Sequence, residues 1–599
     1  DFPAIGESYY PLTLGPNSFY WFSLEKHAVR VKVRAPEDEL EEAPLQLVTI
    51  HNNDVWDPAN LPAIAGVLSG FLPTRRWFRS KDRRFRSVDI TEVVSLQSGQ
   101  FALLLVRADY TSGDPETYLM PVAIALSEQA DSIKRAEAES VIAEIHRLDG
   151  TTALLYDGAV SHEFTTSLLE AFARRRRFNG EEGSMQALRN REFRHLWGPT
   201  HPNFEPTVLA SSEVDTAIKF GDRFVLTLLR RVEPGIHPSV ELGQYLTEVV
   251  HFAHCAPFAG SLEYHAGQSN SEPMTLAVLH GYVPNEGDGW RLTRRELSDY
   301  LQRMGQAKCS IADLQKSAPT AIYDLDFALS DPPEVAGQLI GPYLGLVTAM
   351  GQRVAELHLA LSQNASDPAF APEPFNDFYR QGLYHANIAL TSRRMEFVRQ
   401  RSGDMIPEIR QLAAKVLEQE NAITSRFRAV FDQRIASQRI RFHGRLHLGH
   451  MLIANGDVVM FDFAGEPQLH ISERRIKRCP LRDVASMLYS FGYSAQAAAR
   501  ELLSAERHES ADRDTIRSWA RFWYSHVSAA FIRAYWKTAS PASYMPESQH
   551  DQQVLLDNYL LERALLDVRA DINDKPELAG MPFRVILHLL DAEAEQRMR

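Results

Sequence analysis

The chain has 599 residues, more than one hydrophobic core usually supports, so we expect two to four folded units. Its 44% hydrophobic and 24% charged residues are typical of a globular protein and exclude a disordered or collagen-like chain. The formal charge of −13, from 64 basic and 77 acidic residues, argues against a dedicated nucleic-acid-binding protein. No apolar run reaches the length of a membrane-spanning helix, so we expect no membrane partner.

Three cysteines, Cys255, Cys309 and Cys479, lie far apart, without the short spacing of a zinc site or the even number of a disulfide framework. They indicate a reducing compartment, and we expect a cytoplasmic protein. The chain opens on Asp1 within a β-prone, aromatic segment that turns at Leu14–Pro16. We therefore expect a fragment of a longer polypeptide whose first residues are the end of a β-domain.

The segment that follows is predicted to be a connector and then a small β-rich unit. The acidic run Glu37–Glu42 is typical of a solvated linker. From Leu61 to Leu126 the pattern favours strands, clearest at 88–93, 100–107 and 117–126. Residues 130–148 have a helical period. The four arginines 174–177 are interpreted as the exposed face of a helix that begins near Ser167, with an anionic contact as the alternative.

The next elements have the order of the smaller lobe of a kinase fold. Residues 216–220 and 223–229 flank Gly221-Asp222 and predict a two-residue β-hairpin. Residues 238–251 have helical character, and 274–283 predict a strand that ends in a polar hinge before Trp290. A hairpin, a helix and further strands that lead into a hinge are the parts of a nucleotide-covering lobe.

Beyond Arg291 the pattern becomes helical. Apolar residues recur at steps of three and four in 344–363, and 486–493, 511–536 and 553–570 follow the same period. One segment interrupts this pattern, since 440–467 is strand-like and centres on Asn455-Gly456, a strong hairpin signal. The helical segments predict a second, larger lobe with one inserted hairpin.

The segment from His443 to His450, followed by the hairpin and by Asp462-Phe463-Ala464-Gly465, has the spacing of a kinase catalytic loop and metal loop. In such a site a carboxylate accepts the proton of the substrate hydroxyl, and side chains five residues later and after the hairpin bind magnesium. Position 445 would be the base and position 450 the first metal ligand. Here these residues are Arg445 and His450.

These motifs, together with Gly465-Glu466-Pro467, Glu473-Arg474-Arg475 and the run from Pro480 to Phe491, resemble the maltokinase family. Further similar stretches are Gly221–Gly235, Gly281–Asn285, Ala355–Ala360 and Leu560–Ala564. The family is related to aminoglycoside phosphotransferases and transfers the γ-phosphoryl group of ATP to maltose. The resemblance implies ATP and Mg²⁺ as cofactors, and maltose or a short α-glucan as the ligand.

The resemblance also implies a fold class and a domain order. Residues 1–25 resemble the end of trehalose synthase, an α-amylase relative that is often fused ahead of maltokinase, so a trehalose synthase module is the expected partner. We expect an α+β, bilobal protein-kinase-like fold with a β-rich N-terminal cap, preceded by a short β remnant of an α-amylase-type domain. The expected divisions are 1–25 (remnant), 26–60 (linker), 61–205 (cap), 206–290 (small lobe) and 291–599 (helical lobe with the hairpin 440–467).

Position by position, this sequence departs from the family where the chemistry takes place. The nucleotide-binding lysine corresponds to Thr227, the catalytic Asp to Arg445, the metal-binding Gln to His450, and the Glu of the Asp-Phe-Glu motif to Ala464. The loop over the phosphates reads Glu213-Val214-Asp215-Thr216-Ala217. A positioned general base contributes roughly 10²–10⁴ in rate, so its loss alone predicts severe impairment.

Other family positions are retained, and some lost groups have candidate replacements. Retained residues are Asp462 for magnesium, Glu241 as the usual partner of the lysine, and His443, His447 and Asp483 as supports of the loop. Lys219 either reaches the phosphates or faces solvent. Arg445 either neutralises phosphate without a metal or pairs with Asp462 or Asp483. His450 is either a poor magnesium ligand or a hydrogen-bonded loop residue.

The saccharide is expected to contact the large lobe, where aromatic faces and polar groups alternate with packing residues. The candidates are Glu466, Arg474, Arg475, Trp523, Tyr524 and Glu562, and packing is the alternative role of the aromatic residues. We predict a maltokinase-family protein with weak or no phosphoryl transfer and a saccharide-binding or scaffolding role, which makes it pseudokinase-like. The alternatives are an active sugar kinase with relocated groups, or a purely structural organiser of a trehalose synthase oligomer; a homo-oligomer is compatible with each.

Overall fold

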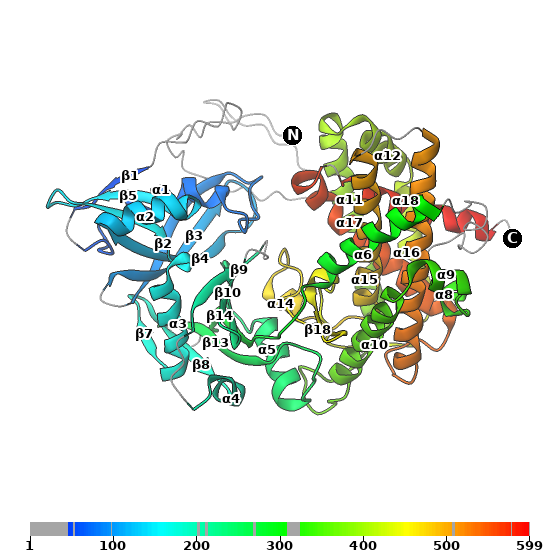
Figure 1. Cartoon of the computed structure of the whole chain (residues 1–599), viewed down its shortest axis with the longest axis horizontal. Helices are drawn as coiled ribbons and strands as arrows, with labels where there is room; N and C mark the ends of the chain where they lie inside the picture. Colours follow the sequence, from blue (N-terminus) through cyan, green and yellow to red (C-terminus); the bar gives the residue numbers. More distant parts are fainter. Residues whose placement is uncertain are drawn as a thin grey trace, which may run out of the picture. The chain divides into compact units, whose positions relative to one another are not determined.

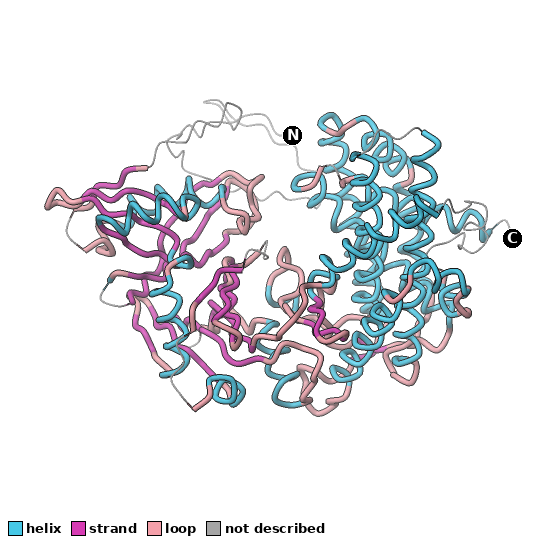
Figure 2. Tube along the Cα trace, viewed as in Figure 1, coloured by secondary structure: helices cyan, strands magenta, loops and turns pink. Residues whose placement is uncertain are grey.

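The computed structural model describes residues 46–51, 54–96, 99–199, 204–209, 214–267, 271–307, 324–505, 510–576 and 578–597. The expected β remnant at 1–25, the acidic run 37–42, Glu213 and Cys309 lie outside these residues. Figure 1 shows the described elements in chain order, and Figure 2 separates the strands of the first part of the chain from the helices of the last part. The result is the expected α+β class with a β-rich N-terminal unit and a helical C-terminal lobe.

The first sheet forms the cap. Its strands are β1 (Leu47–Thr49), β2 (Phe85–Leu96), β3 (Phe101–Tyr110), β4 (Glu116–Leu126), β5 (Val141–His146) and β6 (Thr152–Asp157), in the order β1-β5-β6-β4-β3-β2. Alternate residues of β3 enter two different cores, Leu103 and Leu105 on one face and Leu104 and Val106 on the other. Because successive side chains of a strand point to opposite faces, burial of both faces explains why β3 is apolar without interruption from Phe101 to Val106.

Helices α1 and α2 cover this sheet, and each lies in a segment for which the sequence predicted a different arrangement of elements. The run from Leu61, expected as strand, begins with the helix α1 (Leu61–Phe71), which has Pro62 in its first turn. Residues 130–148, expected as one helix, divide into α2 (Ser127–Ala136) and strand β5. The expected linker 26–60 also contains β1, which pairs with β5. In each case short apolar runs fit both helix and strand, and tertiary packing selects between them.

The four arginines 174–177 do not share one helical face. Helix α3 (His162–Arg174) ends at the first of them, and Arg175 adopts a left-handed conformation with φ of 50°. The chain then enters β7 (Arg177–Asn179). The arginines therefore mark the turn from a helix to a strand rather than the side of a helix.

The second sheet is antiparallel and forms the small lobe. Its order is β7-β8-β13-β14-β11-β10-β9, with β8 (Gly183–Arg189), β9 (Pro206–Leu209), β10 (Thr216–Phe220), β11 (Phe224–Leu228), β13 (Phe258–Ala266) and β14 (Met274–Gly281). Strands β7 and β8 precede the expected division at residue 206, and β12 (Arg231–Val232) pairs back to β4 of the cap. Two strands before residue 206 thus belong to the small-lobe sheet, and one short strand after it belongs to the cap sheet.

The hairpin β10–β11 is present, but its turn has three residues instead of the expected two. Phe220 pairs with Phe224, which leaves Gly221, Asp222 and Arg223 in the turn. Gly221 has a positive φ of 50°. The hairpin is followed by α5 (Pro238–Gln244), which continues as a π-helical turn at Tyr245–Val249.

The large lobe is built from helices, whose apolar faces form one core. They are α6 (Gly289–Ala307), α8 (Leu325–Leu329), α9 (Glu334–Ile340), α10 (Tyr343–Ser362), α11 (Asp377–Arg401), α12 (Pro407–Glu418), α13 (Glu420–Asp432), α14 (Ile471–Arg474), α15 (Leu481–Ala505), α16 (Ser510–Ala539), α17 (Gln549–Asp574) and α18 (Gly580–Arg597). Helices α10 and α16 approach so closely that a Cβ on Gly351 would lie 2.3 Å from the carbonyl oxygen of Phe531. Among the described helices, none has both the length and the apolar content needed to cross a bilayer.

The predicted hairpin inside the large lobe is present. Strands β17 (Met451–Ala454) and β18 (Asp457–Met460) join through Asn455 and Gly456, which have φ values of 52° and 74°. Two successive positive φ values are the signature of a tight hairpin turn. The hairpin places the loop before β17 next to the loop after β18, because the two strands are antiparallel and their outer ends meet.

Candidate functional site

Asp483, at the start of α15, holds the loop that carries the candidate catalytic residues. Its carboxylate accepts hydrogen bonds from the backbone N–H groups of His443 (2.8 Å) and Gly444 (3.0 Å). The same carboxylate lies 3.2 Å from Nε2 of His358, whose Nδ1 lies 2.9 Å from the hydroxyl of Tyr535. All of these groups are buried. The loop is therefore fixed by the core of the large lobe.

Arg445, at the position of the family's base, projects its side chain without a partner of its own. Its backbone N–H donates to Nδ1 of His443 at 3.4 Å, and its carbonyl oxygen lies 2.9 Å from Nδ1 of His450. Its guanidinium forms no hydrogen bond or ion pair with any other residue that the structure describes. The two expected ion pairs, with Asp462 and with Asp483, are therefore not formed.

His450 contacts the carboxylate of Asp462, which is the group expected to contact a metal ion. Nε2 of His450 lies 3.2 Å from Oδ2 of Asp462. Nδ1 faces the Arg445 carbonyl oxygen, so both ring nitrogens face oxygen acceptors. The carboxylate expected to bind magnesium thus already contacts a side chain of the protein.

Asp462 itself has an unusual conformation and charge state. It lies in the left-handed region with φ of 63°. Burial would raise the pKa of its carboxyl group, but the charge and the hydrogen bond of His450 and the charge of Arg445 outweigh this effect, and the pKa is well below its usual range. The carboxylate is therefore ionised at neutral pH. The ionised form of this buried carboxylate is stabilised by the nearby side chains of His450 and Arg445.

His447 packs beside this pair rather than acting on a ligand. Its ring centroid is 3.8 Å from that of His450, and its Nδ1 accepts the N–H of Gly449 at 3.1 Å. Burial, followed by the charges of His450 and Arg445, lowers the pKa of His447 well below its usual value. Burial likewise lowers the pKa of His443 to about 4. Both rings are neutral supports of the loop.

The described residues do not suit Mg²⁺. The ion prefers an octahedron of oxygen ligands, and here one carboxylate is paired with an imidazole while Ala464 contributes no oxygen from its side chain. No group of three or more histidine, cysteine or acidic residues that is able to hold a metal occurs in the described part of the chain. The donor set thus differs from that of a magnesium-dependent kinase.

The nucleotide-facing strands lack the usual lysine and its ion pair. Thr227 lies in the middle of β11, opposite Ala217 and Val278. Glu241, on α5, binds two arginines of the large lobe instead, with Nη2 of Arg441 and Nη2 of Arg475 each at 2.7 Å. The glutamate therefore joins the two lobes rather than orienting a lysine.

Lys219 is held away from the candidate site. Its Nζ lies 2.8 Å from Asp222 in the hairpin turn and 4.1 Å from the ring centre of Tyr282. The hydrogen bond that Lys219 donates to Asp222 raises the pKa of Lys219. Lys219 is not among the residues that line the pocket described below, so the structure does not place it as a substitute for the missing lysine.

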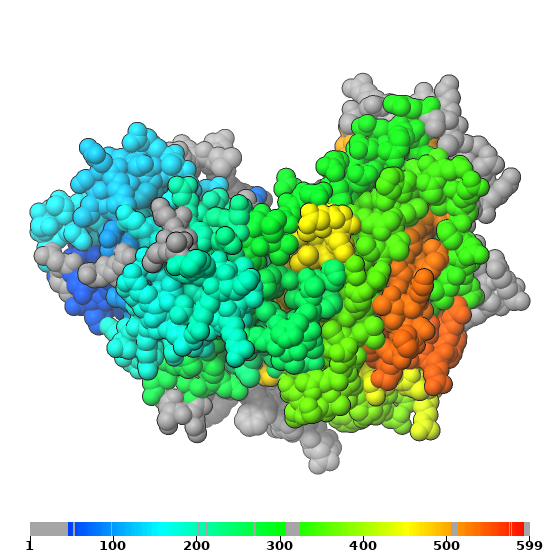
Figure 3. Space-filling view, turned by 60° about the horizontal axis from the view of Figure 1, so that its bottom comes forward, coloured from blue at the N-terminus to red at the C-terminus, as the bar shows by residue number. Residues whose placement is uncertain are grey.

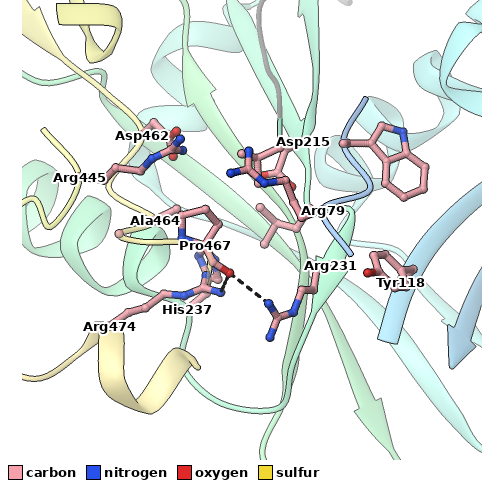
Figure 4. Close-up of a pocket in the computed structure, with 14 residues that line it drawn as sticks. Arg79, Tyr118, Asp215, Arg231, His237, Arg445, Asp462, Ala464, Pro467 and Arg474 are labelled. Atoms are coloured by element: carbon pink, nitrogen blue, oxygen red, sulfur yellow. Dashed lines mark hydrogen bonds between the residues drawn. The ribbon is translucent and has the colours of Figure 1, made fainter. Parts of the chain in front are cut away.

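A small pocket lies where the cap, the small lobe and the catalytic loop meet (Figure 4). It encloses about 40 Å³. The lining combines cap residues, small-lobe residues and residues of both loops of the large lobe: Trp77, Arg79, Tyr118, Val214, Asp215, Leu229, Arg231, His237, Arg445, Asp462, Ala464, Gly465, Pro467 and Arg474. Figure 4 shows Arg445 and Asp462 on one side and Arg79 and Tyr118 on the other. Four guanidinium groups therefore surround one cavity.

Arg230 ties the phosphate-loop position to the cap. It is 2% exposed, and its Nη2 lies 2.7 Å from Oδ2 of Asp157 at the end of β6. Its Nε donates to Oγ1 of Thr216 at 2.8 Å, and its backbone N–H donates to Oδ1 of Asp215 at 2.8 Å. Burial raises the pKa of Asp215 to about 7. Thr216 is thus engaged by Arg230 and supports the loop.

The carboxylates expected to contact a saccharide are paired with arginines inside the large lobe. Glu466 is buried and forms an ion pair with Arg563. Glu562 is buried as well, and Nε of Arg482 lies 2.9 Å from its Oε2. Neither carboxylate is available to a sugar hydroxyl without the loss of an internal ion pair.

The aromatic candidates pack the core. Trp523 is fully buried and stacks on Tyr343 at 5.6 Å between ring centres. Tyr524 is 6% exposed and packs against the backbone of Gly492. A buried indole presents no face to a sugar, so the structure gives these two residues the packing role, which corrects the expected saccharide contact.

The two arginines of the Glu-Arg-Arg motif have different positions. Arg474 lines the pocket, where its Nε donates to the Leu469 carbonyl oxygen at 2.7 Å. Arg475 binds Glu241 and does not line the pocket. The segment with α14 lies beside residues 233–235, because Glu233 accepts the N–H of Ile471 at 3.2 Å. Figure 3 shows this yellow segment at the surface among green segments.

Comparison with known proteins agrees with this geometry. Residues 71–160 match the maltokinase N-terminal cap domain. Residues 71–160 are thus a maltokinase-type cap. A structure of glucosamine kinase in complex with glucosamine, ADP and inorganic phosphate is similar, with 16% identity, a TM-score of 0.50, and coverage of 87% of this chain and 99% of that chain. A second glucosamine kinase structure, crystal form B, has a TM-score of 0.52 with the same identity and coverage.

These likenesses confirm the predicted resemblance to the maltokinase family and the kinase-like fold. The maltokinase-type cap supplies part of the pocket, and sequence reasoning missed this contribution. It did not single out Arg79, Tyr118, Arg231 or His237. The available signal was the Arg230-Arg231 pair directly after β11, inside a stretch that already resembled the family.

Proposed function

We propose that this chain is a maltokinase-type protein in which phosphoryl transfer from ATP to a sugar is absent or very weak, and which acts by binding a ligand. Saccharide binding or a scaffolding role in trehalose and α-glucan metabolism, with a trehalose synthase module as partner, belongs to the same proposal. The observation that carries it is the charge at the catalytic loop. A guanidinium, Arg445, stands where the reaction needs a carboxylate, and His450 already binds Asp462.

The energetic effect of these changes is large. Phosphoryl transfer depends on positioning and on electrostatic stabilisation of the transferred group. The missing base corresponds to roughly 10²–10⁴ in rate, and the missing lysine removes a fixed positive charge from the phosphates. These effects are not additive. Each is severe alone, and Thr227 and Arg445 occur in the same chain.

The two groups that could replace the missing lysine and the missing base both form ion pairs with other residues. Lys219 is bound to Asp222, and Glu466, the candidate for a displaced base, is bound to Arg563. The fold is nevertheless one in which a similar protein, glucosamine kinase, has been seen with glucosamine, ADP and inorganic phosphate. This likeness supports retention of a ligand-binding role.

Product formation tests the proposal. Purified chain is incubated with ATP, Mg²⁺ and maltose or glucosamine, and phosphosugar is measured by ³¹P NMR for the wild type, Asp462→Asn and the matched control Asp457→Asn, whose carboxylate pairs with Arg353 away from the pocket. We expect no turnover above background in any of the three. Turnover of about 1–100 s⁻¹ that Asp462→Asn abolishes and Asp457→Asn retains would show an active kinase and refute the proposal.

A further inference from the structure

We propose that the pocket binds the phosphate group of a ligand without a divalent cation, with Arg445 supplying the positive charge that a metal ion supplies in a magnesium-dependent kinase. The inference rests on the proposed function and specifies its ligand, a phosphorylated small molecule. It follows from four features of the pocket: a guanidinium without a partner, a metal-ligand position occupied by His450, further arginines in the lining, and the volume of the cavity.

The first feature is the availability of Arg445. It lines the pocket and is only half-buried. Within the described part of the chain its guanidinium has neither an acceptor nor an acidic partner, although Asp462 and Asp483 both lie in the neighbouring loops. A guanidinium presents up to five donors in a planar fork that matches a phosphate group. Its donors are therefore free for an anion.

The second feature is the state of Asp462. Oδ2 of this carboxylate faces Nε2 of His450, and the second nitrogen of the ring faces the Arg445 carbonyl oxygen. The Asp462 oxygen that a metal ion would bind thus contacts a side-chain nitrogen of the protein. Because neither Asp462 nor Asp483 pairs with its guanidinium, the charge of Arg445 remains to balance a bound phosphate.

The third feature is the remainder of the lining. Arg231 donates to the Pro467 carbonyl oxygen at 3.1 Å (Figure 4), and its Nε is buried without a hydrogen-bond partner. Arg474 donates to the same carbonyl oxygen at 3.2 Å, and Glu233 lies behind both arginines. A buried donor without an acceptor is costly in the free protein, so an anion within reach of Arg231 would lower this cost.

The fourth feature is size. A cavity of about 40 Å³ holds about three water molecules, since one needs roughly 10–15 Å³ by the same measure. This space has room for a single phosphoryl group. Asp215 and Asp462 also face the cavity, so the arginines are needed to offset their charge as well.

Calorimetric titration with inorganic phosphate in the presence of EDTA tests the inference on the full chain. We compare the wild type with Arg445→Gln, Arg445→Lys and the control Arg428→Gln, an exposed arginine paired with Asp432 on α13. We expect wild type and control to bind alike, Arg445→Gln to bind at least about tenfold more weakly, and Arg445→Lys to be intermediate, because lysine keeps the charge but not the fork. Added Mg²⁺ should change none of these affinities.

Several outcomes would overturn the inference. Equal phosphate affinity of the wild type and Arg445→Gln would show that Arg445 does not hold the anion. Binding that appears only with Mg²⁺, or no binding at all, would show that a cation is required or that the pocket takes another ligand. These outcomes are distinguishable from failure of the proposed function, because phosphate binding is measured without ATP or sugar and turnover is measured separately.

Discussion

Arg445 shows how a single side chain affects the charge around Asp462. The charge of Arg445 contributes to the low pKa of that carboxyl group. Nε2 of His450 lies 3.2 Å from the same carboxylate. Under the proposed function, position 445 is that of a catalytic aspartate, so an arginine there changes the local charge by two units.

We expect that restoring the family's residues at three positions together restores phosphoryl transfer. The triple variant Thr227→Lys/Arg445→Asp/His450→Gln returns the lysine, the base and the oxygen ligand, and should gain at least about 10² in Mg²⁺-dependent phosphosugar formation over the wild type. Each single variant should gain little, since these groups act together. Absence of any gain in a triple variant with wild-type thermal stability would contradict the assignment of the lost activity to these positions.

Asp571 on α17 gives a prediction for pH dependence. Burial, followed by the charge of Asp567, raises its pKa to about 8 in the folded protein, against about 3.9 in an unfolded chain. The folded state therefore binds the proton more tightly, and the stability that this proton contributes is lost as pH rises from about 4 through about 8. Asp571→Asn remains neutral, so its melting temperature should fall less than that of the wild type between pH 5 and pH 9.

Asp557→Asn is the matched control for this experiment, because Asp557 lies on the same helix and pairs with Arg426. Loss of that ion pair should lower the melting temperature at neutral pH without flattening its pH dependence. Parallel pH profiles for the wild type and Asp571→Asn would contradict the raised pKa.

Among the elements, the two hairpins show what local sequence predicts. The turn at Asn455 and Gly456 needs two positive φ values and was predicted from the residues alone. The turn at Gly221-Asp222 was predicted with two residues, but the register of Phe220 with Phe224 adds Arg223. Turn length depends on which strand residues pair, and packing of the sheet decides that pairing.

The Asn-Gly hairpin can be tested by glycine replacement. Gly456→Ala forces a Cβ into a residue with φ of 74° and should destabilise the protein by about 1 kcal/mol. Gly382→Ala is the opposite control, because Gly382 lies inside α11 with open space around it and should stabilise the helix by about 0.5–1 kcal/mol. Chemical denaturation measures both, and a stabilising Gly456→Ala would refute the turn geometry.

Arg230 connects two elements that the sequence analysis assigned to separate domains, the cap and the small lobe. This residue connects the end of β6 to the start of β10. Arg230→Met removes one partner of a buried ion pair and should destabilise the protein by about 3–5 kcal/mol. The double variant Arg230→Met/Asp157→Leu should recover part of that loss, since it leaves no unpaired buried charge. Equal losses in the single and double variants would contradict the pairing.

For the whole molecule, periodicity and motif order predicted the fold class, because long helices such as α10 and α16 bury continuous faces. The same reasoning predicted the hairpin at Asn455 and Gly456, which is present, while the catalytic role of the loop before it stays a prediction. It did not predict that β12 pairs with the cap or that Arg79 and Tyr118 complete the pocket. Contacts between distant segments leave no local pattern in a sequence, so they had to come from the structure.

Calorimetry with ATP, performed with Mg²⁺ and again with EDTA, tests the central claim most directly. The claim is that protein cations have replaced the metal at Asp462. It predicts that Mg²⁺ does not strengthen the binding of ATP, whatever the affinity measured in EDTA. Stoichiometric binding of ATP that is at least tenfold tighter with Mg²⁺ and that disappears in Asp462→Asn would contradict it.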